Sequence, residues 1–467
     1  MTAVKKVFGR FIGDKAFYGM ILSIAIPMMI QNGITNFVNL LDNIMVGQLG
    51  TESMSGVAIA NQLIFVFNLC VFGGISGAGI FCAQFFGSGN SEGVRQTFRF
   101  KLILCALLCV AFISIFMLFD DQLLSLYLHE SDSGDLAMTL SEGKTYLMIM
   151  LVGLIPFAIT SSYVGTLRET GETLLPMKAG IAAVLVNFVF NWLLIFGNLG
   201  FPVMGVAGAA VATVLSRYVE LVIVVVWAHT HKQKHPYMEG LYSSLHISGT
   251  LLASIIRKGW PLLLNELLYS IGTTMIIQCY SMRGLSAIAA VNISSTLSNL
   301  FKVVFFASGN AIAIIVGNLL GAGRMEVARE TDYKMIFTSV VMCGLIGMAL
   351  FIVAPLFPAM YNTTDEVREL ATVFLRITAI IMPVMSFNHC CYFTLRSGGK
   401  TIITFIFDSM FIWVVLLPPT FAVAKLTALS VVFMYAMVQG LELIKSVLGF
   451  ILVKGGSWIS NIVIADI

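Results

Sequence analysis

Nine ionisable side chains lie within long apolar stretches of this 467-residue sequence. A charge near the centre of a bilayer costs at least roughly 2.5–3.5 kcal/mol on insertion scales, so each is a candidate functional group. A carboxylate in such a place could take up and release a proton, or could ligate Na⁺ through its oxygens. The acids are Asp42, Glu220, Glu266, Asp408 and Glu442, and the bases are Arg217, Lys302, Arg376 and Lys445.

Asp42 and Glu266 are the candidates for binding a coupling ion. Asp42 follows Pro27 on a stretch whose amides, including Asn36 and Asn39, recur at roughly helical spacing. This polar stripe needs water or a partner, and Asn36 and Asn39 are expected to line a substrate cavity. The alternative for Asp42 is a position at the helix end near the outer interface. Glu266 lies deep in the seventh apolar stretch, so a position at the membrane interface is a weaker alternative for Glu266 than for Asp42.

Three further sites could contact substrate. Asn187 and Asn191 share one helix face at i and i+4, where they could hydrogen-bond a substrate or the neighbouring helix. Lys302 is expected to face the cavity, either as an ion-pair partner or as a contact for an anion. Asp408 could contact substrate or pair across the two halves of the chain.

The remaining charges are candidates for ion pairs. Arg217 and Glu220 lie one helical turn apart, at i and i+3, which permits neutralisation within one helix. Glu442 and Lys445 have the same spacing and the same simple explanation. Arg376 could form an ion pair between the two halves of the chain, or it could contact substrate.

The composition excludes a soluble protein. Hydrophobic residues make up 58% of the chain and charged residues only 11%, and the mean hydropathy is +0.92. An average soluble protein has about 25% charged residues, so this chain lacks the polar material for a water-facing surface. The net charge of +3 does not indicate nucleic-acid binding. The eight cysteines have no metal-ligand spacing, and no H-E-x-x-H or G-x-S-x-G motif indicates an enzyme.

Twelve apolar stretches are long enough to span a bilayer as helices, which predicts an all-α integral membrane protein. With a cytoplasmic N-terminus, 19 Lys and Arg residues fall on the inside and four on the outside. The positive-inside rule therefore predicts a multi-pass protein of the cell membrane with both termini in the cytoplasm. The expected cores are 17–46, 56–84, 101–119, 145–167, 179–197, 205–229, 260–281, 286–318, 335–359, 371–395, 401–424 and 427–453.

The chain also contains an internal repeat. Residues 27–100 align without gaps on residues 261–334, and both copies contain G-x-G-x-x-E-x-x-R-x-T near their ends. A second, shorter match aligns the T-L-R sequence of residues 166–168 with the T-L-R sequence of residues 394–396. Six spans per copy return the chain to the same side, so the copies are parallel repeats, an architecture typical of transporters. The expected parts are an N-terminal lobe (1–229), a cytoplasmic linker (230–258) and a C-terminal lobe (259–467).

These features together resemble the multidrug and toxic compound extrusion (MATE) family. The first span resembles the family's proline helix, with Pro27 followed by D-x-x-M-x-G at residues 42–47. The stretch 187–210, with I-F-G, G-F-P and G-V-A-G-A-A, is similar to the family's signature across the fifth and sixth helices. The two T-L-R segments complete the likeness, which covers nearly the whole chain.

The resemblance implies two pseudo-symmetric six-helix lobes around a V-shaped cavity. It implies an antiporter that exports amphipathic, cationic organic compounds in exchange for H⁺ or Na⁺, with Asp42 as the coupling carboxylate. The expected partners are small molecules and the lipid bilayer, the expected assembly is a monomer, and no cofactor beyond the coupling ion is expected. The alternative is a flippase or exporter of a lipid-linked or anionic metabolite on the same superfamily fold, which Lys302, Arg217 and Arg376 keep open.

Overall fold

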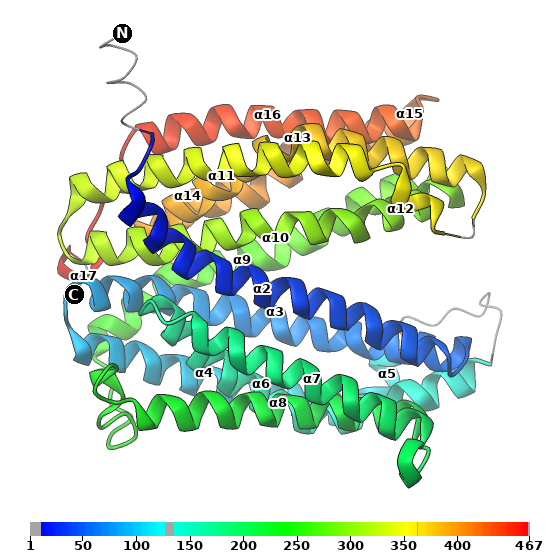
Figure 1. Ribbon diagram of the computed structural model, residues 1–467, viewed down its shortest axis with the longest axis horizontal. Helices are drawn as coiled ribbons and strands as arrows, with labels where there is room; N and C mark the ends of the chain where they lie inside the picture. The colour runs from blue at the N-terminus through cyan, green and yellow to red at the C-terminus, as the bar shows by residue number, and fades with distance from the viewer. Residues whose placement is uncertain (1–10, 127–134, 362, 466–467) are drawn as a thin grey trace. The chain divides into compact units, whose positions relative to one another are not determined.

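The computed structural model describes residues 11–126, 135–361 and 363–465, and within them the regular structure is helical (Figure 1). Twelve helices are long and apolar enough to cross a membrane. The predicted all-α class and its twelve spans are therefore confirmed. The spans are α2 (Lys15–Gly47), α3 (Thr51–Gly87), α4 (Ser91–Leu118), α6 (Leu136–Glu169), α7 (Leu174–Phe196), α8 (Gly205–Thr230), α9 (Gly249–Ser281), α10 (Leu285–Gly321), α11 with α12 (Met325–Ala359), α13 (Asp365–Ser397), α14 to α15 (Thr401–Leu426) and α16 (Val431–Lys454).

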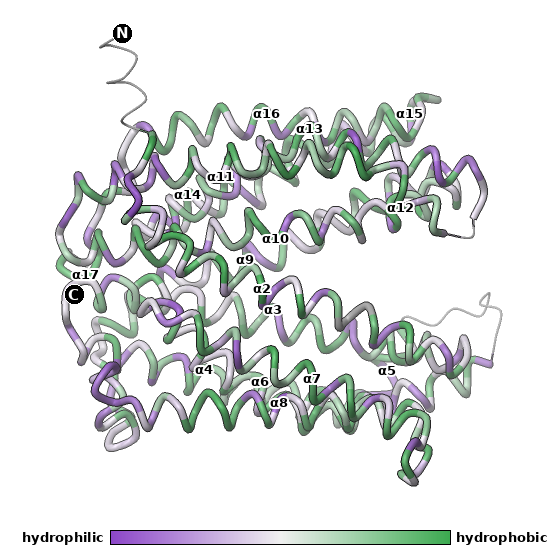
Figure 2. The backbone as a smooth tube through the Cα atoms, viewed as in Figure 1, coloured by the Kyte–Doolittle hydropathy of each residue, from purple (hydrophilic) through white to green (hydrophobic). Residues whose placement is uncertain are grey.

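Short elements join or interrupt these helices. They are α5 (Asp120–Ser125), η1 (Asn198–Gly200), η2 (Pro236–Met238), α12 (Leu356–Ala359) and α17 (Ile462–Ala465). The eleventh span consists of α14 (Thr401–Phe405), η3 (Ile406–Met410), η4 (Ile412–Leu416) and α15 (Leu417–Leu426). Apolar residues run along most of each span, and isolated hydrophilic positions interrupt them (Figure 2).

The helix boundaries follow the sequence repeat. In its gapless register, both ends of α9 coincide with the ends of α2, and both ends of α10 coincide with those of α3. The start of α11 coincides with the start of α4 in the same register. The end of α13 coincides with that of α6 in the register of the T-L-R match. Each half of the chain thus builds its helices from the same pattern.

The chain divides into two compact units. The N-unit comprises Ile30–Cys82 and Ser91–Leu252, and the C-unit comprises Ala253–Ile467, Ala83–Asn90 and the described residues up to Met29. The expected boundaries at residues 229 and 259 stay a prediction. In the N-unit, buried Phe67 packs against the rings of Phe112 and Phe157. In the C-unit, Phe374 stacks on Tyr435 with ring centroids 4.4 Å apart.

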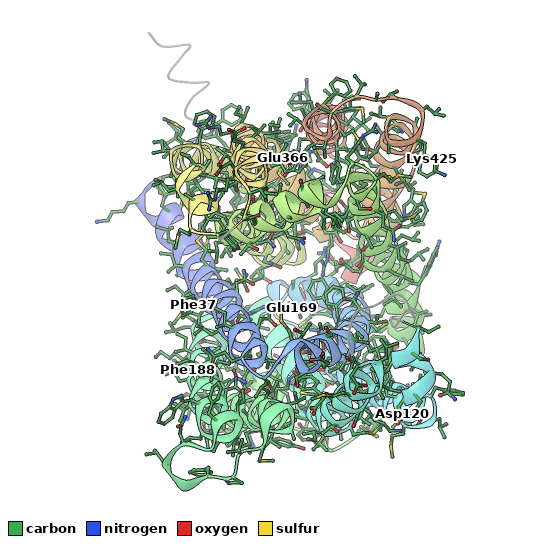
Figure 3. All side chains as sticks on the ribbon, turned by 90° about the vertical axis from the view of Figure 1, so that its right-hand side faces the viewer. Phe37, Asp120, Glu169, Phe188, Glu366 and Lys425 are labelled. Carbon is green, nitrogen blue, oxygen red and sulfur yellow. The ribbon has the colours of Figure 1, made fainter. Side chains whose placement is uncertain are left out.

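Large apolar side chains also cover the outside of the helices. Phe37 of α2 is 56% exposed and Phe188 of α7 is 42% exposed (Figure 3). Because a bilayer core offers no water, such side chains contact acyl chains there, while the helices satisfy their own backbone groups.

Two glycines allow the ends of α3 and α10 to meet within the C-unit. A Cβ added at Gly87 would lie 1.9 Å from the carbonyl oxygen of Asn318. A Cβ added at Gly321 would lie 1.9 Å from the carbonyl oxygen of Gln84. Gly321 is the repeat equivalent of Gly87, and Asn318 is the equivalent of Gln84. The two helix ends therefore pack backbone against backbone in a reciprocal contact.

The side chain of Gln84 fixes the C-terminal segment at this point. It is fully buried. Its Nε2 donates to the carbonyl oxygens of Ser397 and Ser460 at 2.9 and 3.2 Å, and its Oε1 accepts from the Ile462 amide at 2.9 Å. These bonds satisfy backbone groups that would otherwise be buried without a partner.

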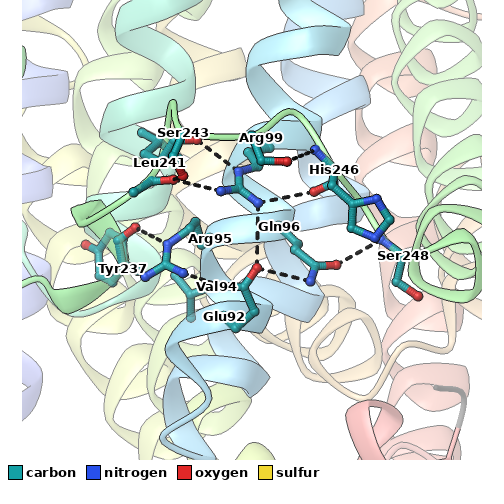
Figure 4. Close-up of polar contacts among 12 residues, drawn as sticks. Glu92, Val94, Arg95, Gln96, Arg99, Tyr237, Leu241, Ser243, His246 and Ser248 are labelled. Atoms are coloured by element: carbon teal, nitrogen blue, oxygen red, sulfur yellow. Dashed lines mark hydrogen bonds and ion pairs between the residues drawn. The ribbon is translucent and has the colours of Figure 1, made fainter.

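The segment between α8 and α9 is held on α4 (Figure 4). The guanidinium of Arg99, which is 5% exposed, donates to the carbonyl oxygens of Gly240, Leu241 and His246 at 2.7, 2.9 and 3.2 Å. Gln96 Oε1 accepts from the amide of Ser248 at 3.0 Å. Burial lowers the pKa of His235 in the same segment below its usual value, since the charged ring is poorly solvated there. The segment is therefore an ordered part of the N-unit.

Replacing Arg99 with Ala is expected to free this segment. A hydrogen bond to a charged group contributes roughly 1.5–3 kcal/mol, so trypsin cleavage after Lys232 and Lys234 should accelerate at least about tenfold. Limited proteolysis of the purified protein measures the rate. Arg95→Ala is the matched control, because Arg95 donates to one carbonyl of the segment, that of Tyr237, at 3.3 Å. Equal acceleration in both variants would contradict the anchoring role of Arg99.

Candidate functional site

Asp42 lies at one end of a hydrogen-bonded chain in the N-unit. Asn191 Nδ2 donates to Asp42 Oδ1 at 2.5 Å and to Asn187 Oδ1 at 3.2 Å. Asn187 Nδ2 in turn donates to Thr213 Oγ1 at 3.2 Å. Asn191 is 1% exposed and Asn187 is 5% exposed. The chain thus joins α2, α7 and α8 through buried polar atoms and brings together three residues that the sequence predicts for the site.

Local helix geometry explains this arrangement. Asn187 and Asn191 lie at i and i+4 on α7, so their side chains lie one above the other on the same helix face. Asn187 donates to the threonine, whereas Asn191 donates both to the carboxylate and to Asn187. Asn191 contributes a neutral dipole to Asp42 rather than a compensating charge. Such an arrangement suits a carboxylate that exchanges a cation, because the amide can stay in place in both states.

The C-unit contains a longer polar network around Asn265. The Tyr392 hydroxyl donates to Glu266 Oε1 at 3.3 Å, and Asn265 Nδ2 donates to the Tyr392 hydroxyl at 3.4 Å. The same amide donates to Asp408 Oδ2 at 3.2 Å, and Lys445 Nζ donates to Asp408 Oδ1 at 2.7 Å. The network therefore joins α9, α13, η3 and α16, with Glu266 at one end and the ion pair at the other.

Asp408 lies in a part of the eleventh span where the helix is widened. Ile406–Met410 and Ile412–Leu416 are π-helical turns, which are frequent at functional sites. Asn265 Oδ1 accepts from the Ser409 amide at 3.2 Å and from its hydroxyl at 2.7 Å, so Asn265 holds this turn as well as the Asp408 side chain. Two prolines follow at 418 and 419, and neither can donate a backbone hydrogen bond to the preceding turn.

The expected pair of Glu442 with Lys445 is replaced by pairs between helices. Lys445, which is 6% exposed, pairs with Asp408, and its ammonium also lies 5.2 Å from the ring centre of Phe407. Glu442 accepts from Asn388 Nδ2 at 2.8 Å. A carboxylate on a neighbouring helix satisfies the buried ammonium better than a residue one turn away on the same helix, because both side chains can point into one interior site.

The other ion-pair candidates contact aromatic rings. The guanidinium of Arg217 lies 4.7 Å from the ring centre of Phe157, and that of Arg376 lies 5.4 Å from the ring centre of Phe351. Within the described part of the chain, Arg217 and Glu220 form no ion pair within 4.0 Å, although each acts electrostatically on the other. The contacts of these two guanidinium groups with aromatic rings are favourable, because the ring quadrupole attracts a cation.

Three predicted cavity residues have no assigned place in these networks. Lys302 lies on α10, where the charge of Glu442 acts on it electrostatically. Asn36 is exposed on α2. The side chain of Asn39 lies outside the described residues. Their assignment to a substrate cavity stays a prediction.

Two fully buried charges in the described part of the chain were not singled out from the sequence. Lys101 of α4 is fully buried, forms an ion pair with Glu169, and donates to Thr166 Oγ1 at 3.2 Å. Asp332 of α11 is also fully buried and accepts from Thr394 Oγ1 at 2.6 Å. The two threonines begin the repeated T-L-R segments, so equivalent hydroxyls hold a cation in one half and an acid in the other. The repeated threonines are the sequence signal that could have located both charges.

Comparison with known proteins agrees with this architecture. The MatE family profile matches residues 27–193 and 261–421. The probable multidrug resistance protein NorM of Thermotoga maritima is 24% identical over 438 residues, covering 94% of this chain and 92% of NorM. The probable multidrug resistance protein YoeA of Bacillus subtilis is 22% identical over 409 residues, covering 87% of each chain.

Solved structures show the same fold. An outward-facing multidrug resistance MATE family transporter of the MOP superfamily superposes with a TM-score of 0.83 at 20% identity, covering 94% of this chain and 96% of that one. A MOP superfamily transporter from Pyrococcus furiosus superposes with a TM-score of 0.82 at 20% identity, covering 93% and 95%. The report of the Pyrococcus protein states that the reverse polarity of its binding pocket suggests a different function.

Proposed function

Because this chain belongs to the MatE family, whose members are transporters and not enzymes, we propose that it is a secondary antiporter. It exports amphipathic, cationic organic compounds, including drugs, in exchange for H⁺ or Na⁺. The observation that carries the proposal is the chain from Asp42 through Asn191 and Asn187 to Thr213, which joins an acid of α2 to two buried amides of α7 and, through them, to a hydroxyl of α8. The names of the NorM and YoeA relatives support drugs as the substrate class.

Coupling follows from linked equilibria. If the ion binds Asp42 more tightly in one facing state and the substrate binds more tightly in the other, each ligand shifts the transporter away from the state the other prefers. The polar chain supplies a route for this effect, since a change of charge at Asp42 changes the strength of the hydrogen bond from Asn191, which joins α2 to α7. The protein works as a monomer and needs no cofactor beyond the ion.

The excess of basic residues supports one orientation. The 19 Lys and Arg residues on one set of segments and the four on the other favour a protein of the cell membrane with both termini in the cytoplasm.

Glu266 is proposed as a second ion-binding carboxylate, in the C-unit. Replacing it with Gln keeps an acceptor for the Tyr392 hydroxyl but removes the charge. The expected result is a change of about tenfold in the Na⁺ or H⁺ concentration that gives half-maximal export, within the usual range of coupling between sites. Transport in proteoliposomes across a series of Na⁺ concentrations and pH values measures it. Glu239→Gln, in the segment between α8 and α9, is the control, and an unchanged response in both variants would return Glu266 to a structural role.

A lipid-linked or anionic substrate is the alternative. The cations Lys302, Arg217 and Arg376 lie within membrane spans, and Arg217 and Arg376 contact rings in place of acids. An anionic substrate would find partners there that a cationic substrate would not.

Transport of a cationic dye in proteoliposomes, with Na⁺ and H⁺ gradients imposed independently, tests the proposal. Dye movement that follows one of the gradients supports cation-coupled export and identifies the ion. Absence of movement under both gradients, with movement of an anionic or lipid-linked substrate instead, would contradict it.

A further inference from the structure

A groove of about 440 Å³ lies on the C-unit between α11 and α16, with α13 beneath it. We refer to it as the α11–α16 groove. Ten side chains line it; seven are apolar, one is a tyrosine and two are the basic residues Arg329 and Lys454. None of these ten carries a carboxylate. The groove is therefore apolar along most of its wall and positively charged at specific points.

Both charges lie at the same end of the groove. Arg329 lies in the second turn of α11, which begins at Met325, and Lys454 is the last residue of α16. The groove continues along α11 as far as Val340. The rise of roughly 1.5 Å per residue makes this distance about 16 Å, which is close to half of a hydrocarbon core of about 30 Å. The groove thus has the depth of one lipid leaflet, with its cations at the headgroup end.

Neutral groups contact the two cations. Arg329 Nε donates to the Tyr333 hydroxyl at 3.3 Å, and Lys454 Nζ lies 5.5 Å from the ring centre of Phe450. Glu326, near the start of α11, acts on Arg329 electrostatically. In the ranges that the structure describes, however, neither cation forms an ion pair with a carboxylate within 4.0 Å. Their positive charge is therefore available to a ligand.

In the first repeat, the segment before α9 covers the face of α4 that corresponds to the groove face of α11. Arg95 and Arg99, the equivalents of Arg329 and Tyr333, bind backbone carbonyls of the segment before α9. The equivalent segment before α2 includes Phe11, whose ring lies 5.6 Å from that of Phe337 in the groove wall. The sequence before Phe11 carries Lys5, Lys6 and Arg10 and no acid. The ten residues before Phe11 therefore add basic side chains and no carboxylate to the sequence next to Phe11.

We propose that the α11–α16 groove binds an anionic phospholipid. The phosphate is held between Arg329 and Lys454, and one acyl chain lies along Phe337, Val340 and Phe450. Basic pockets between membrane helices on the cytoplasmic side are suited to anionic headgroups. Guanidinium and ammonium groups both bind phosphate oxygens through charge-assisted hydrogen bonds. The proposal does not depend on what the protein transports.

Lipid binding to the full-length protein in detergent tests this proposal. Phosphatidylglycerol and phosphatidylcholine with identical acyl chains are titrated separately, and native mass spectrometry counts the bound lipids. The expected result is one phosphatidylglycerol that binds at least about tenfold more tightly than phosphatidylcholine, since each basic residue near the surface adds to the attraction for an anionic lipid. Equal binding of the two lipids would overturn the proposal.

Three variants locate the lipid. Replacing Arg329 and Lys454 together with Ala is expected to weaken phosphatidylglycerol binding about 30-fold. Lys232→Ala with Lys234→Ala removes the same number of charges from two exposed positions and is expected to leave binding unchanged. Val340→Trp keeps both cations but fills the groove, and it is expected to displace the lipid. Undiminished binding in the Arg329 and Lys454 variant, or in Val340→Trp, would show that the lipid lies elsewhere.

Discussion

Replacing Asp42 with Asn is expected to abolish the dependence of export on the imposed ion gradient. Asparagine has nearly the shape of aspartate and can still accept a hydrogen bond from Asn191. Its neutral amide, however, does not take up a proton near neutral pH and carries no charge to attract Na⁺. Coupling between two sites is typically about 5–150-fold, so the acceleration of export by the gradient should fall from about 100-fold to none. Initial rates of dye export from proteoliposomes, with and without the gradient, measure the change.

Binding of the dye to the detergent-solubilised variant separates coupling from folding. Asp42→Asn is expected to bind dye with an affinity that no longer changes with Na⁺ concentration or pH. Asp121→Asn is the control, because its side chain is 57% exposed and pairs with Lys144. An Asp42→Asn protein that exports with the native gradient dependence would rule out Asp42 as the coupling carboxylate.

Replacing Gly321 with Ala is expected to lower the free energy of unfolding by about 3 kcal/mol, the upper part of the usual range for overpacking. The new methyl group would lie 1.9 Å from the carbonyl oxygen of Gln84, so one of the two helix ends must move. That movement also disturbs the three hydrogen bonds of the Gln84 side chain to the C-terminal segment. Thermal unfolding followed with a thiol-reactive dye measures the change, because seven of the eight cysteines are buried.

Gly440→Ala is the matched control for this substitution. Gly440 lies inside α16, and an added Cβ would meet nothing within 4 Å. Since glycine within a helix is less favourable than alanine by roughly 0.5–1 kcal/mol, this variant is expected to be as stable as the native protein or slightly more stable. Similar unfolding of the two alanine variants would show that the ends of α3 and α10 do not pack as closely as the structure indicates.

The sequence predicted the helices well because their signal is periodic and repeated. The offset between the two copies, read from matched glycines and charges, also describes both ends of α9 and α10 relative to α2 and α3. The expected cores were shorter than several helices: the third was expected from residue 101, whereas α4 begins at Ser91. Hydropathy locates only the apolar part of a helix, and α4 begins with polar turns that bind the segment before α9.

The polar networks were only partly accessible from the sequence. The spacing of Asn187 and Asn191 on one helix predicted their shared face, since that relation is local. The pairing of Lys445 with Asp408 depends on how α16 packs against η3, which no spacing within one helix reveals. Lys101 and Asp332 lie near helix ends in the sequence, where charges are normally solvated, and only the packing of neighbouring helices shows that both are buried.

The reciprocal contact of Gly87 and Gly321 has the form of an isologous dimer interface. In such an interface, residue i of one subunit meets residue j of the other, and residue j of the first meets residue i of the second. Here the backbone at 87 meets that at 318 and the backbone at 321 meets that at 84, so one continuous chain contains both copies of the contact. A homodimer must carry every substitution twice, whereas a fused chain can change one copy alone. Gln84 illustrates that freedom: its equivalent, Asn318, has a side chain one methylene shorter, and the longer Gln84 holds the C-terminal segment through both its amide nitrogen and its oxygen.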